Sequence, residues 1–334
     1  MEIFATIDFA PFLKGGKHVD YKMIISVIGA GALGKTYGGL LALAGHEVHF
    51  LAHSEYEALH TAGSFDIRLK ELNTTLTVKS FFIHKNPEDL PPSDLVIIAL
   101  KTTANHAIKS LITHCITDSS IVLILQNGIG SEEWISQFTG KAPIVCGISF
   151  IGAYRDGIHL DISFLGNLKL APFGEATIET CQWIVNAFQL APIPLQITLH
   201  ENYKEIRWQK LLWNIPFGAL SIIFDLSTDI LAQQEPYRTM VFDLMNEICV
   251  VAKAEGIIFE KPVQEQMVNY TAQAGDYFPT IHRDYHEGKP IEKEYMFDNV
   301  LAIAKQHGCI VPFLTLVDKQ LQTLLLIPRT SRGK

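Results

Sequence analysis

Apolar residues in the first part of the chain gather in short runs that polar segments separate. The runs at 23–28 (MIISVI), 47–52 (EVHFLA), 94–100 (DLVIIAL) and 121–125 (IVLIL) are rich in β-branched residues. Their length and composition are typical of strands buried on both faces. Between the first two runs, apolar residues recur three and four positions apart, which predicts a helix that ends at Gly45. The order strand, helix, strand predicts a parallel sheet.

After residue 200 the strand pattern gives way to helical periodicity. The apolar run at 142–157 continues the series of predicted strands, in strand–helix–strand order. Further along, helices are predicted to begin after Pro236, at Pro290 and at Pro312, because proline is favoured in the first turn of a helix. The second part of the chain is therefore predicted to be all-helical.

Three glycines stand between the first predicted strand and its helix. Gly29, Gly31 and Gly34 form the pattern GxGxxG. In such a pattern the first glycine makes a tight turn, the second lets the backbone approach a pyrophosphate, and the third lets helix and strand pack closely. The free N–H groups at the start of the helix then face the phosphates. This segment predicts dinucleotide binding.

Together these patterns predict an α/β protein in which a Rossmann-type dinucleotide-binding domain precedes an all-helical domain. We place the first domain at residues 23–200 and the second, which we expect to bind substrate and to dimerise, at residues 201–334. Residues 1–22 do not resemble a signal peptide, because their basic residues follow the apolar ones. We interpret them as an N-terminal extension.

The end of the second predicted strand distinguishes the two nicotinamide cofactors. NAD-binding proteins usually carry an acidic residue there for the ribose hydroxyls, whereas NADP-binding proteins avoid that charge. Here the sequence is LAHSEY, with His53 and Ser54 at the tip. This favours NADP, with His53 and Ser54 at its 2′-phosphate. The nearby Glu55 keeps NAD as the alternative.

Polar residues follow two other predicted strands. Lys101 comes directly after the run at 94–100, and Asn127 follows the run at 121–125. Ligands of open α/β sheets gather at the carboxyl ends of strands, so we predict that Lys101 and Asn127 lie in the cofactor crevice. For Lys101 alone, a solvated strand end is the alternative.

The segment 207–220 (RWQKLLWNIPFGAL) has the pattern of a buried helix that carries polar residues. Lys210, Asn214 and Gly218 are four positions apart and therefore share one stripe of the helix. Apolar neighbours would desolvate Lys210, which lowers the pKa of an ammonium group toward neutrality and lets it donate a proton. A snorkelling lysine beside a core asparagine is the alternative.

Composition argues against two classes of partner. The 334 residues, 48% of them hydrophobic and 19% charged, suffice for two domains with cores of their own. Lysine and arginine number 27 against 35 acidic residues, a net charge of -8 without a basic cluster, so we predict no nucleic-acid partner. No apolar run reaches the roughly 20 residues that span a bilayer, so we predict no membrane partner.

Metal and disulfide sites are not predicted either. Five cysteines are widely spaced and form no CxxC pair, so we expect buried or partly buried thiols in the cytoplasm. His282 and His286 are four positions apart, as in some zinc sites, but no third ligand accompanies them in the sequence. We interpret this pair as part of a solvated helix face.

Five motifs, in their order along the chain, resemble those of the ketopantoate reductases, also called 2-dehydropantoate 2-reductases. They are GAGALG (29–34), LK (100–101), QNG (126–128), KLLWN (210–214) and a late helix with Asp284, Gly288 and Glu292. The resemblance runs from Met23 nearly to the C-terminus. It implies NADPH-dependent reduction of the 2-keto acid ketopantoate to pantoate, in the synthesis of pantothenate and coenzyme A. We expect a homodimer formed through the helical domain.

The resemblance also implies roles for the matching residues. Cofactor contacts would come from Gly29, Ala30, Gly31, Ala32, Leu33 and Gly34 at the pyrophosphate, and from Lys101, Asn127, Ala153 and Glu292 along the cleft. Lys210 corresponds to the family's catalytic lysine, and Glu292 to a glutamate near the nicotinamide, which we also count as catalytic. Substrate contacts would come from Asn127, Lys210, Asn214 and Thr280, the last in place of a serine. A cationic lysine there polarises the keto oxygen and then protonates it.

Two positions depart from the family pattern. The family usually has a second substrate asparagine where this chain has Gly218, and another where it has Thr228. We still count Gly218 as a substrate-side position, because it shares the stripe of Lys210. Since these changes remove polar contacts, a relative that reduces another 2-keto acid is the first alternative. A non-catalytic NADP-binding sensor is the second.

Overall fold

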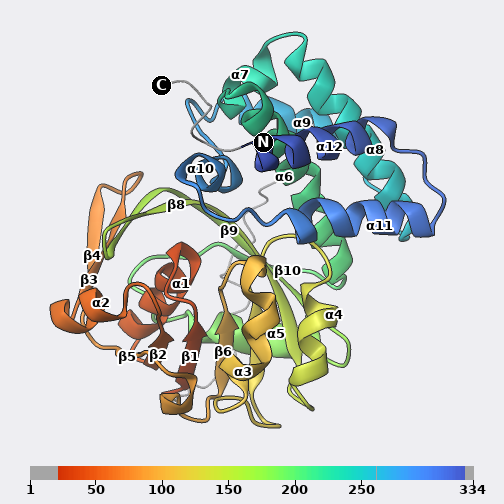
Figure 1. Ribbon diagram of the computed structural model, residues 1–334. Helices are drawn as coiled ribbons and strands as arrows, with labels where there is room; N and C mark the ends of the chain where they lie inside the picture. Colours follow the sequence, from red (N-terminus) through yellow and green to blue (C-terminus); the bar gives the residue numbers. More distant parts are fainter. Residues whose placement is uncertain (1–21, 261, 328–334) are drawn as a thin grey trace, which may run out of the picture.

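The structure, a computed structural model, describes residues 22–260 and 262–327. Figure 1 shows two parts of different character, strands with their helices in one and helices alone in the other. Within the described ranges all strands precede residue 200, and every later element is helical. The predicted fold class is thus confirmed, a Rossmann-type α/β part followed by a helical one. The predicted extension, except for Lys22, lies outside the described residues.

Among the described residues, ten strands form one mixed sheet in the order β4-β3-β9-β8-β7-β6-β1-β2-β5, with β10 beside β9. Their bounds are β1 (Ile24–Ile28), β2 (Glu47–Leu51), β3 (Phe65–Leu69), β4 (Thr74–Val78), β5 (Phe82–His84), β6 (Leu95–Ile98), β7 (Ile121–Ile124), β8 (Ile144–Asp156), β9 (His159–Phe173) and β10 (Ile197–Leu199).

Helices cover the sheet and make up the second part. Those that belong with the sheet are α1 (Ala32–Leu43), α2 (Tyr56–Ala62), α3 (Ile108–Ile112), α4 (Ser131–Ile135) and α5 (Ile178–Ala187), with short 3-10 turns η1 (Pro87–Asp89), η2 (Thr102–Ala107) and η3 (Ser136–Phe138). The later ones are α6 (Tyr203–Phe224), α7 (Thr228–Gln233), α8 (Tyr237–Ala254), α9 (Val263–Thr271), α10 (Thr280–Glu287), the π-helix η4 (Glu294–Asp298), α11 (Asn299–Gln306) and α12 (Pro312–Leu326). None of the described helices is long and apolar enough to span a bilayer.

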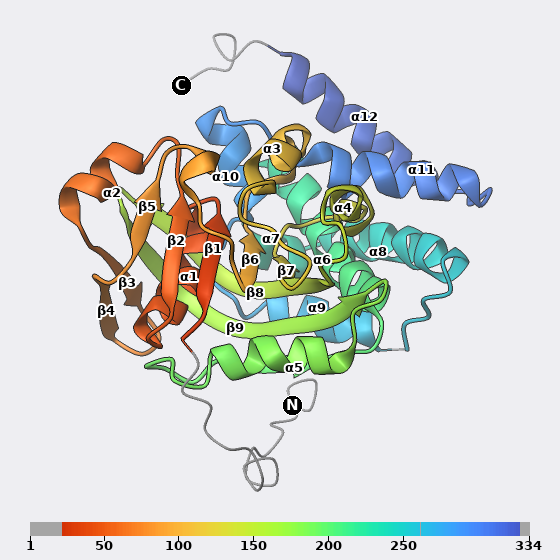
Figure 2. The same cartoon turned by 90° about the horizontal axis from the view of Figure 1, so that it is seen from below.

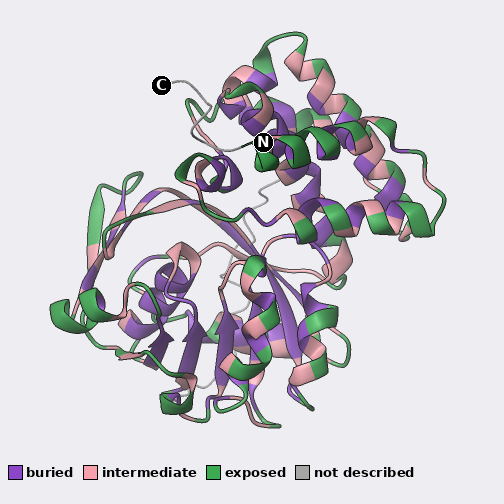
Figure 3. Ribbon diagram, viewed as in Figure 1, coloured by how far each residue is buried: buried purple, intermediate pink, exposed green. Residues whose placement is uncertain are grey.

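The parallel centre of the sheet explains the uninterrupted apolar runs. β2, β1, β6, β7 and β8 pair in parallel in this order. Alternate residues of β6 belong to different cores: Leu95 and Ile97 pack in the cluster that includes α1, whereas Val96 and Ile98 pack in the cluster that includes α3. Both faces of β6 are therefore covered, and this strand is buried at every position, as are most residues of the strands beside it (Figure 3).

The long hairpin of β8 and β9 was not predicted. The run at 142–157 does form a strand, but β9 returns antiparallel to it, from Ile144 opposite Phe173 to Asp156 opposite His159. β9 then pairs with β3, so the sheet curls around α1, which contacts β1, β2, β4, β6, β8 and β9. Figure 2 shows α5 along the outer side of this hairpin. The expected strand–helix–strand order ends at β8 because β9 needs no crossover.

α6 is the central helix of the helical part. It contacts α7, α8, α10 and α12 and also touches β8 and β9. Two predicted helix starts are confirmed, since α8 follows Pro236 and α12 begins at Pro312. All five cysteines are free and at least partly buried, as expected.

The helix start predicted at Pro290 was wrong. Ile291 and Glu292 are not helical, and the helix begins at Lys293 and continues as η4. The Glu292 side chain bonds instead to the N–H of Thr102 in the other part of the molecule. A contact between such distant segments leaves no local signal in the sequence.

Gly34 is the position at which α1 lies closest to the preceding turn, and it supplies a test of the packing. A Cβ added to Gly34 would lie 2.0 Å from the carbonyl oxygen of Gly29, a backbone atom that cannot rotate away. We expect Gly34→Ala to lower the free energy of unfolding by about 1–3 kcal/mol, as overpacking typically does. Gly31→Ala is the matched control, because nothing lies within 4 Å of a Cβ there. Thermal unfolding of the ligand-free protein compares them, and equal stability of the two variants would contradict the packing argument.

Candidate active site

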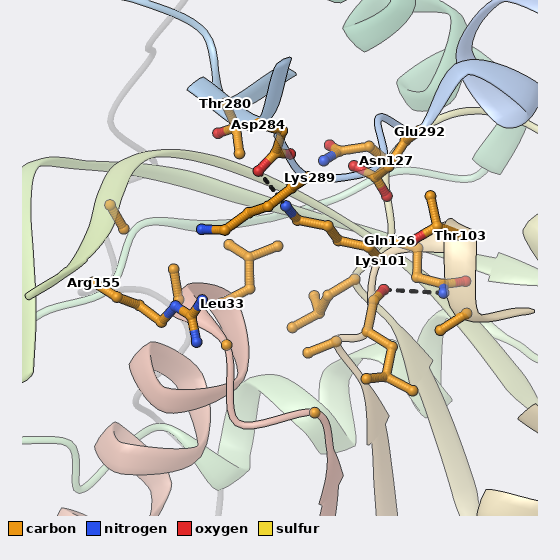
Figure 4. A pocket seen from close by; sticks show the side chains of 18 of the residues that line it. Leu33, Lys101, Thr103, Gln126, Asn127, Arg155, Thr280, Asp284, Lys289 and Glu292 are labelled. Atoms are coloured by element: carbon orange, nitrogen blue, oxygen red, sulfur yellow. Dashed lines mark hydrogen bonds and ion pairs between the residues drawn. The ribbon is translucent and has the colours of Figure 1, made fainter. Parts of the chain in front are cut away.

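A cleft of about 1210 Å³ lies between the carboxyl ends of the parallel strands and the helical part. Residues that follow β1, β2, β6 and β7 form one side together with β8, and α6, α10 and the segment before η4 form the other. Figure 4 shows side chains from both sides pointing into the cleft. Because pockets for drug-sized ligands are about 300–1,000 Å³, this cleft has room for a dinucleotide together with a small second molecule.

The glycine turn after β1 has the shape of a phosphate cradle. Gly29 has a φ of +105°, which lets the chain turn sharply. Gly31 precedes α1 in extended conformation, and open space lies where its Cβ would stand. Ala32 and Leu33 line the cleft in the first turn of α1, where N–H groups have no partner within the helix. These features fit the pyrophosphate of a dinucleotide.

The acidic residue that follows β2, Glu55, is paired with two basic side chains. The Glu55 carboxylate accepts from Lys35 Nζ at 2.7 Å and from Arg155 Nη1. His53 and Ser54 are exposed and line the cleft beside it. With its charge compensated, Glu55 offers little repulsion to a phosphate, and Arg155 is a good phosphate ligand.

Two polar contacts join the segment after β6 to the helical part. The Lys101 Nζ pairs with Asp284 of α10 at 2.5 Å (Figure 4). Glu292 accepts from the N–H of Thr102 at 2.9 Å and from its hydroxyl at 3.2 Å. Burial raises the pKa of Glu292, and the N–H of Thr102 opposes that rise. The structure therefore brings Lys101 and Glu292 together at the cleft, although they are far apart in sequence.

Asn127 lies in a turn that neighbours on both sides hold. The Gln126 side chain donates to two oxygens of the segment after β6, at 2.7 and 3.0 Å. Gly128 has a φ of +86°, and a Cβ there would lie 2.5 Å from the carbonyl oxygen of Tyr295 in η4. Only glycine lets the turn lie this close to the backbone of Tyr295. The turn places Asn127 beside Glu292 (Figure 4).

Lys210 enters the cleft from α6 and has no hydrogen-bond or ion-pair partner among the residues the structure describes. Its Nζ lies over the rings of Phe150 and Trp213, 4.3 and 5.5 Å from their centroids. Burial, and to a smaller extent the positive charge of Lys169 on β9, lower the pKa of Lys210 to about 8. Such an ammonium is still protonated at neutral pH and gives up its proton readily, in agreement with the expectation from the sequence.

Other predicted residues share this cleft. Asn214 lies one turn beyond Lys210 on α6 and donates to the Sδ of Met296 at 3.8 Å. Thr280 begins α10, Ala153 belongs to β8, and both line the cleft.

Gly218 and Thr228 lie outside the cleft. Gly218 is buried, and Ile281 of α10 lies 2.9 Å from where its Cβ would stand. Thr228 is fully buried at the start of α7, where its N–H donates to the carbonyl of Tyr277 at 2.9 Å. Placing Gly218 on the substrate side is therefore corrected, because Ile281 covers it and lines the cleft itself.

A buried ion pair fixes α6 against the sheet part. The side chains of Arg207 and Glu132 are both fully buried. Arg207 donates through Nε to Glu132 Oε1 at 3.1 Å and through Nη2 to the same oxygen, and its Nη1 donates to the carbonyl of Gln126. Since Gln126 precedes Asn127 and Arg207 lies nearly one helical turn before Lys210, the pair sets the position of Lys210 relative to Asn127.

The histidine pair of α10 is not a solvated face, contrary to the prediction. His282 is buried, and only His286 is exposed. Their Nε2 atoms lie 2.9 and 3.2 Å from Oδ1 of Asp225. Asp225 follows α6 and comes from a distant segment, so the local sequence could not reveal it as a third group.

Several residues in or near the cleft were not predicted from the sequence. Arg155 lies on β8 within the predicted run, but no role was assigned to it, and Lys169 lies on β9, whose alternating polar and apolar positions were the signal that could have identified that strand. Arg207 could have been noticed as a charge inside an apolar helical segment, since such residues are rarely buried without a partner. Its partner Glu132 gives no signal of its own.

Fold and cleft together define a class of protein, a Rossmann-type dinucleotide-binding protein whose cleft is closed on one side by a helical part. Two family models match the chain: "Ketopantoate reductase PanE/ApbA" over residues 25–175 and "Ketopantoate reductase PanE/ApbA C terminal" over residues 202–324. The chain belongs to the ketopantoate reductase family, whose cofactor is NADPH.

Similar proteins span the same length. The 2-dehydropantoate 2-reductase of Nostoc sp. is 32% identical over 90% of this chain and 94% of its own. That of Pyrococcus abyssi is 28% identical, over 85% and 91%. The crystal structure of 2-dehydropantoate 2-reductase from Geobacter metallireducens superimposes with a TM-score of 0.84 at 29% identity, over 90% of this chain and 99% of that one.

The buried ion pair supplies a test of the site's architecture. We expect Arg207→Met to lower the free energy of unfolding by about 3–5 kcal/mol, because it leaves Glu132 charged and unpaired. The double variant Arg207→Met, Glu132→Leu removes both charges and should recover most of that stability, yet it lacks the bond to the Gln126 carbonyl and should keep a reduced kcat. Thermal unfolding and steady-state kinetics measure the two effects. Full activity in the double variant would show that the pair does not position Lys210.

Proposed function

We propose that this protein catalyses the NADPH-dependent reduction of ketopantoate to pantoate, a step in the synthesis of pantothenate and coenzyme A. One observation carries the proposal beyond family membership: Lys210, buried and without an ion-pair partner among the described residues, stands in the cleft that begins at the glycine turn. A proton donor of this kind is what reduction of a carbonyl requires.

We assign the cofactor to the side of the cleft formed by the sheet. The turn from Gly29 to Gly34 would hold the pyrophosphate, with His53 and Ser54 at the 2′-phosphate, and Arg155 beside them supports NADP over NAD. Lys101, Asn127, Ala153 and Glu292 would line the nicotinamide half. When bound there, NADPH supplies the hydride.

We assign the reacting carbonyl to the space in front of Lys210. Its ammonium would donate a hydrogen bond to the keto oxygen and then transfer the proton as the alkoxide forms, an effect typically worth about 10² to 10⁴ in rate. Asn127, Asn214 and Thr280 can bond carboxylate and hydroxyl oxygens without adding charge. Glu292 serves the cofactor side, since its bonds are to Thr102 and burial rather than Lys210 governs its pKa.

Reduction of another 2-keto acid is the second candidate. The positions where the family usually has substrate asparagines are here Gly218 and Thr228, and neither lines the cleft. Ile281 lies beside Gly218 and lines the cleft. This side of the cleft is therefore apolar, whereas the asparagines usual in the family would make it polar. A more apolar keto acid than ketopantoate suits such a wall.

Three further assignments stay predictions. The domain division near residue 200 would fall between β10 and α6. We also expect a homodimer formed through the helical domain and a cytoplasmic location.

The proposal predicts saturable NADPH oxidation with ketopantoate and a dependence on Lys210. We expect Lys210→Ala to lower kcat by about 10² or more while NADPH binding is kept. Lys204→Ala is the matched control, because Lys204 lies on the same helix, outside the cleft, paired with Glu255. Steady-state rates with NADPH and NADH, ketopantoate and a panel of branched and aromatic 2-keto acids measure substrate and cofactor choice together.

Each outcome of this panel is decisive. A tenfold or greater preference for another keto acid would favour the second candidate, and a preference for NADH would overturn the cofactor assignment. Near-normal kcat in the Lys210 variant would remove this lysine from the mechanism.

A further inference from the structure

Three side chains with metal-binding chemistry meet at the end of α6. Among the described residues, Asp225, His282 and His286 place a carboxylate oxygen and two imidazole nitrogens within 4.8 Å of one another. Asp225 caps α6, whereas the histidines are four residues apart on α10 and therefore point the same way. Two elements distant in sequence thus present ligand atoms to one point.

The distances among these atoms match those of a bound transition metal. With bonds of 2.0–2.2 Å, neighbouring ligand atoms of a tetrahedral zinc ion lie about 3.4 Å apart. Here the Asp225 Oδ1 lies 2.9 Å from Nε2 of His282 and 3.2 Å from Nε2 of His286. A small outward movement of the carboxylate would therefore admit the ion without refolding of either helix.

We propose that Asp225, His282 and His286 form a binding site for a divalent transition metal of the Zn²⁺ type, separate from the active site. Two imidazoles and one carboxylate are ligands that suit such an ion, whereas Ca²⁺ and Mg²⁺ prefer oxygen ligands alone. A water molecule would complete the coordination, since the Asp225 side chain is 68% exposed and that of His286 is 44% exposed.

The surroundings hold the ligands in place. The ring of Phe278 stacks on His282 with 4.4 Å between centroids, and Tyr285 meets His286 edge-on at 5.3 Å. Asp225 has a left-handed backbone, with a φ of +53°, which aspartate and asparagine tolerate better than most residues. These ring contacts reduce the ordering of the two histidines that metal binding would otherwise require.

The ion would join the two helices that carry the substrate side of the cleft. α6 bears Lys210 and Asn214, and α10 bears Thr280 and Asp284, whereas none of the three metal ligands lines the cleft. Bound metal therefore stabilises the pairing of α6 with α10 and takes no part in the reaction itself.

Metal binding to the full-length protein tests the proposal. After treatment with a chelator and its removal, the protein is titrated with ZnCl₂ by calorimetry, and its thermal unfolding is recorded with and without ZnCl₂. The variants are Asp225→Asn, which keeps the left-handed backbone accessible, and His286→Gln, which keeps a polar group of similar reach. His60→Gln is the matched control, an exposed histidine on α2 in the other part of the molecule.

We expect one Zn²⁺ per chain, a raised Tm in its presence, and at least a tenfold weaker binding in both cluster variants but not in the control. Titration with MgCl₂ should show no binding. Turnover in the presence of chelator should be the same for wild type and both cluster variants. Absence of saturable Zn²⁺ binding by the wild type, or binding that both cluster variants retain at full strength, would overturn the proposal.

Discussion

The ion pair of Arg207 and Glu132 is the constraint on which the active site depends. Both charges are fully buried, and the same guanidinium also donates to the carbonyl of Gln126. Removing two charges from water costs several kcal/mol per ion, and the direct contact between the two side chains offsets much of that cost. It connects the helix of Lys210 to the turn of Asn127.

Further contacts continue this connection along the cleft. Lys101 pairs with Asp284, and Thr102 bonds to Glu292. The N–H of Ile129 donates to the carbonyl oxygen of Tyr295 in η4 at 2.9 Å. These contacts join the helical part to the carboxyl ends of the strands, which is where α/β sheets bind their ligands. The cleft is thus lined by residues of both the sheet part and the helical part.

Electrostatics divides the cleft into two regions. Near β2, Lys35 and Arg155 compensate Glu55, which leaves that end able to accept a phosphate. Near α6, Lys210 is buried beside the ring of Phe150, and burial together with the charge of Lys169 lowers its pKa. The proposed reaction requires a proton in the second region, where Lys210 has no hydrogen-bond or ion-pair partner among the described residues.

Local patterns predicted much of this arrangement. Strand runs, the glycine turn and the helix of Lys210 are visible because each depends on residues close in sequence. The hairpin of β8 and β9, the burial of Gly218 under Ile281 and the late start of the helix after Pro290 were missed, because pairing and packing between distant segments decide them. The third partner of the histidine pair, Asp225, was missed for the same reason.

The central claim is that Lys210 donates the proton, and the pH dependence of kcat/KM with NADPH and ketopantoate tests it most directly. Since burial lowers the pKa of Lys210 to about 8, its ammonium form disappears as the pH rises through that value. The account predicts that kcat/KM is independent of pH near neutrality and falls about tenfold per pH unit above about pH 8. In Lys169→Met, which removes the neighbouring charge, this fall should begin at a higher pH. A rate that stays level to about pH 10, with no loss of protein stability, would contradict the assignment of Lys210 as the proton donor.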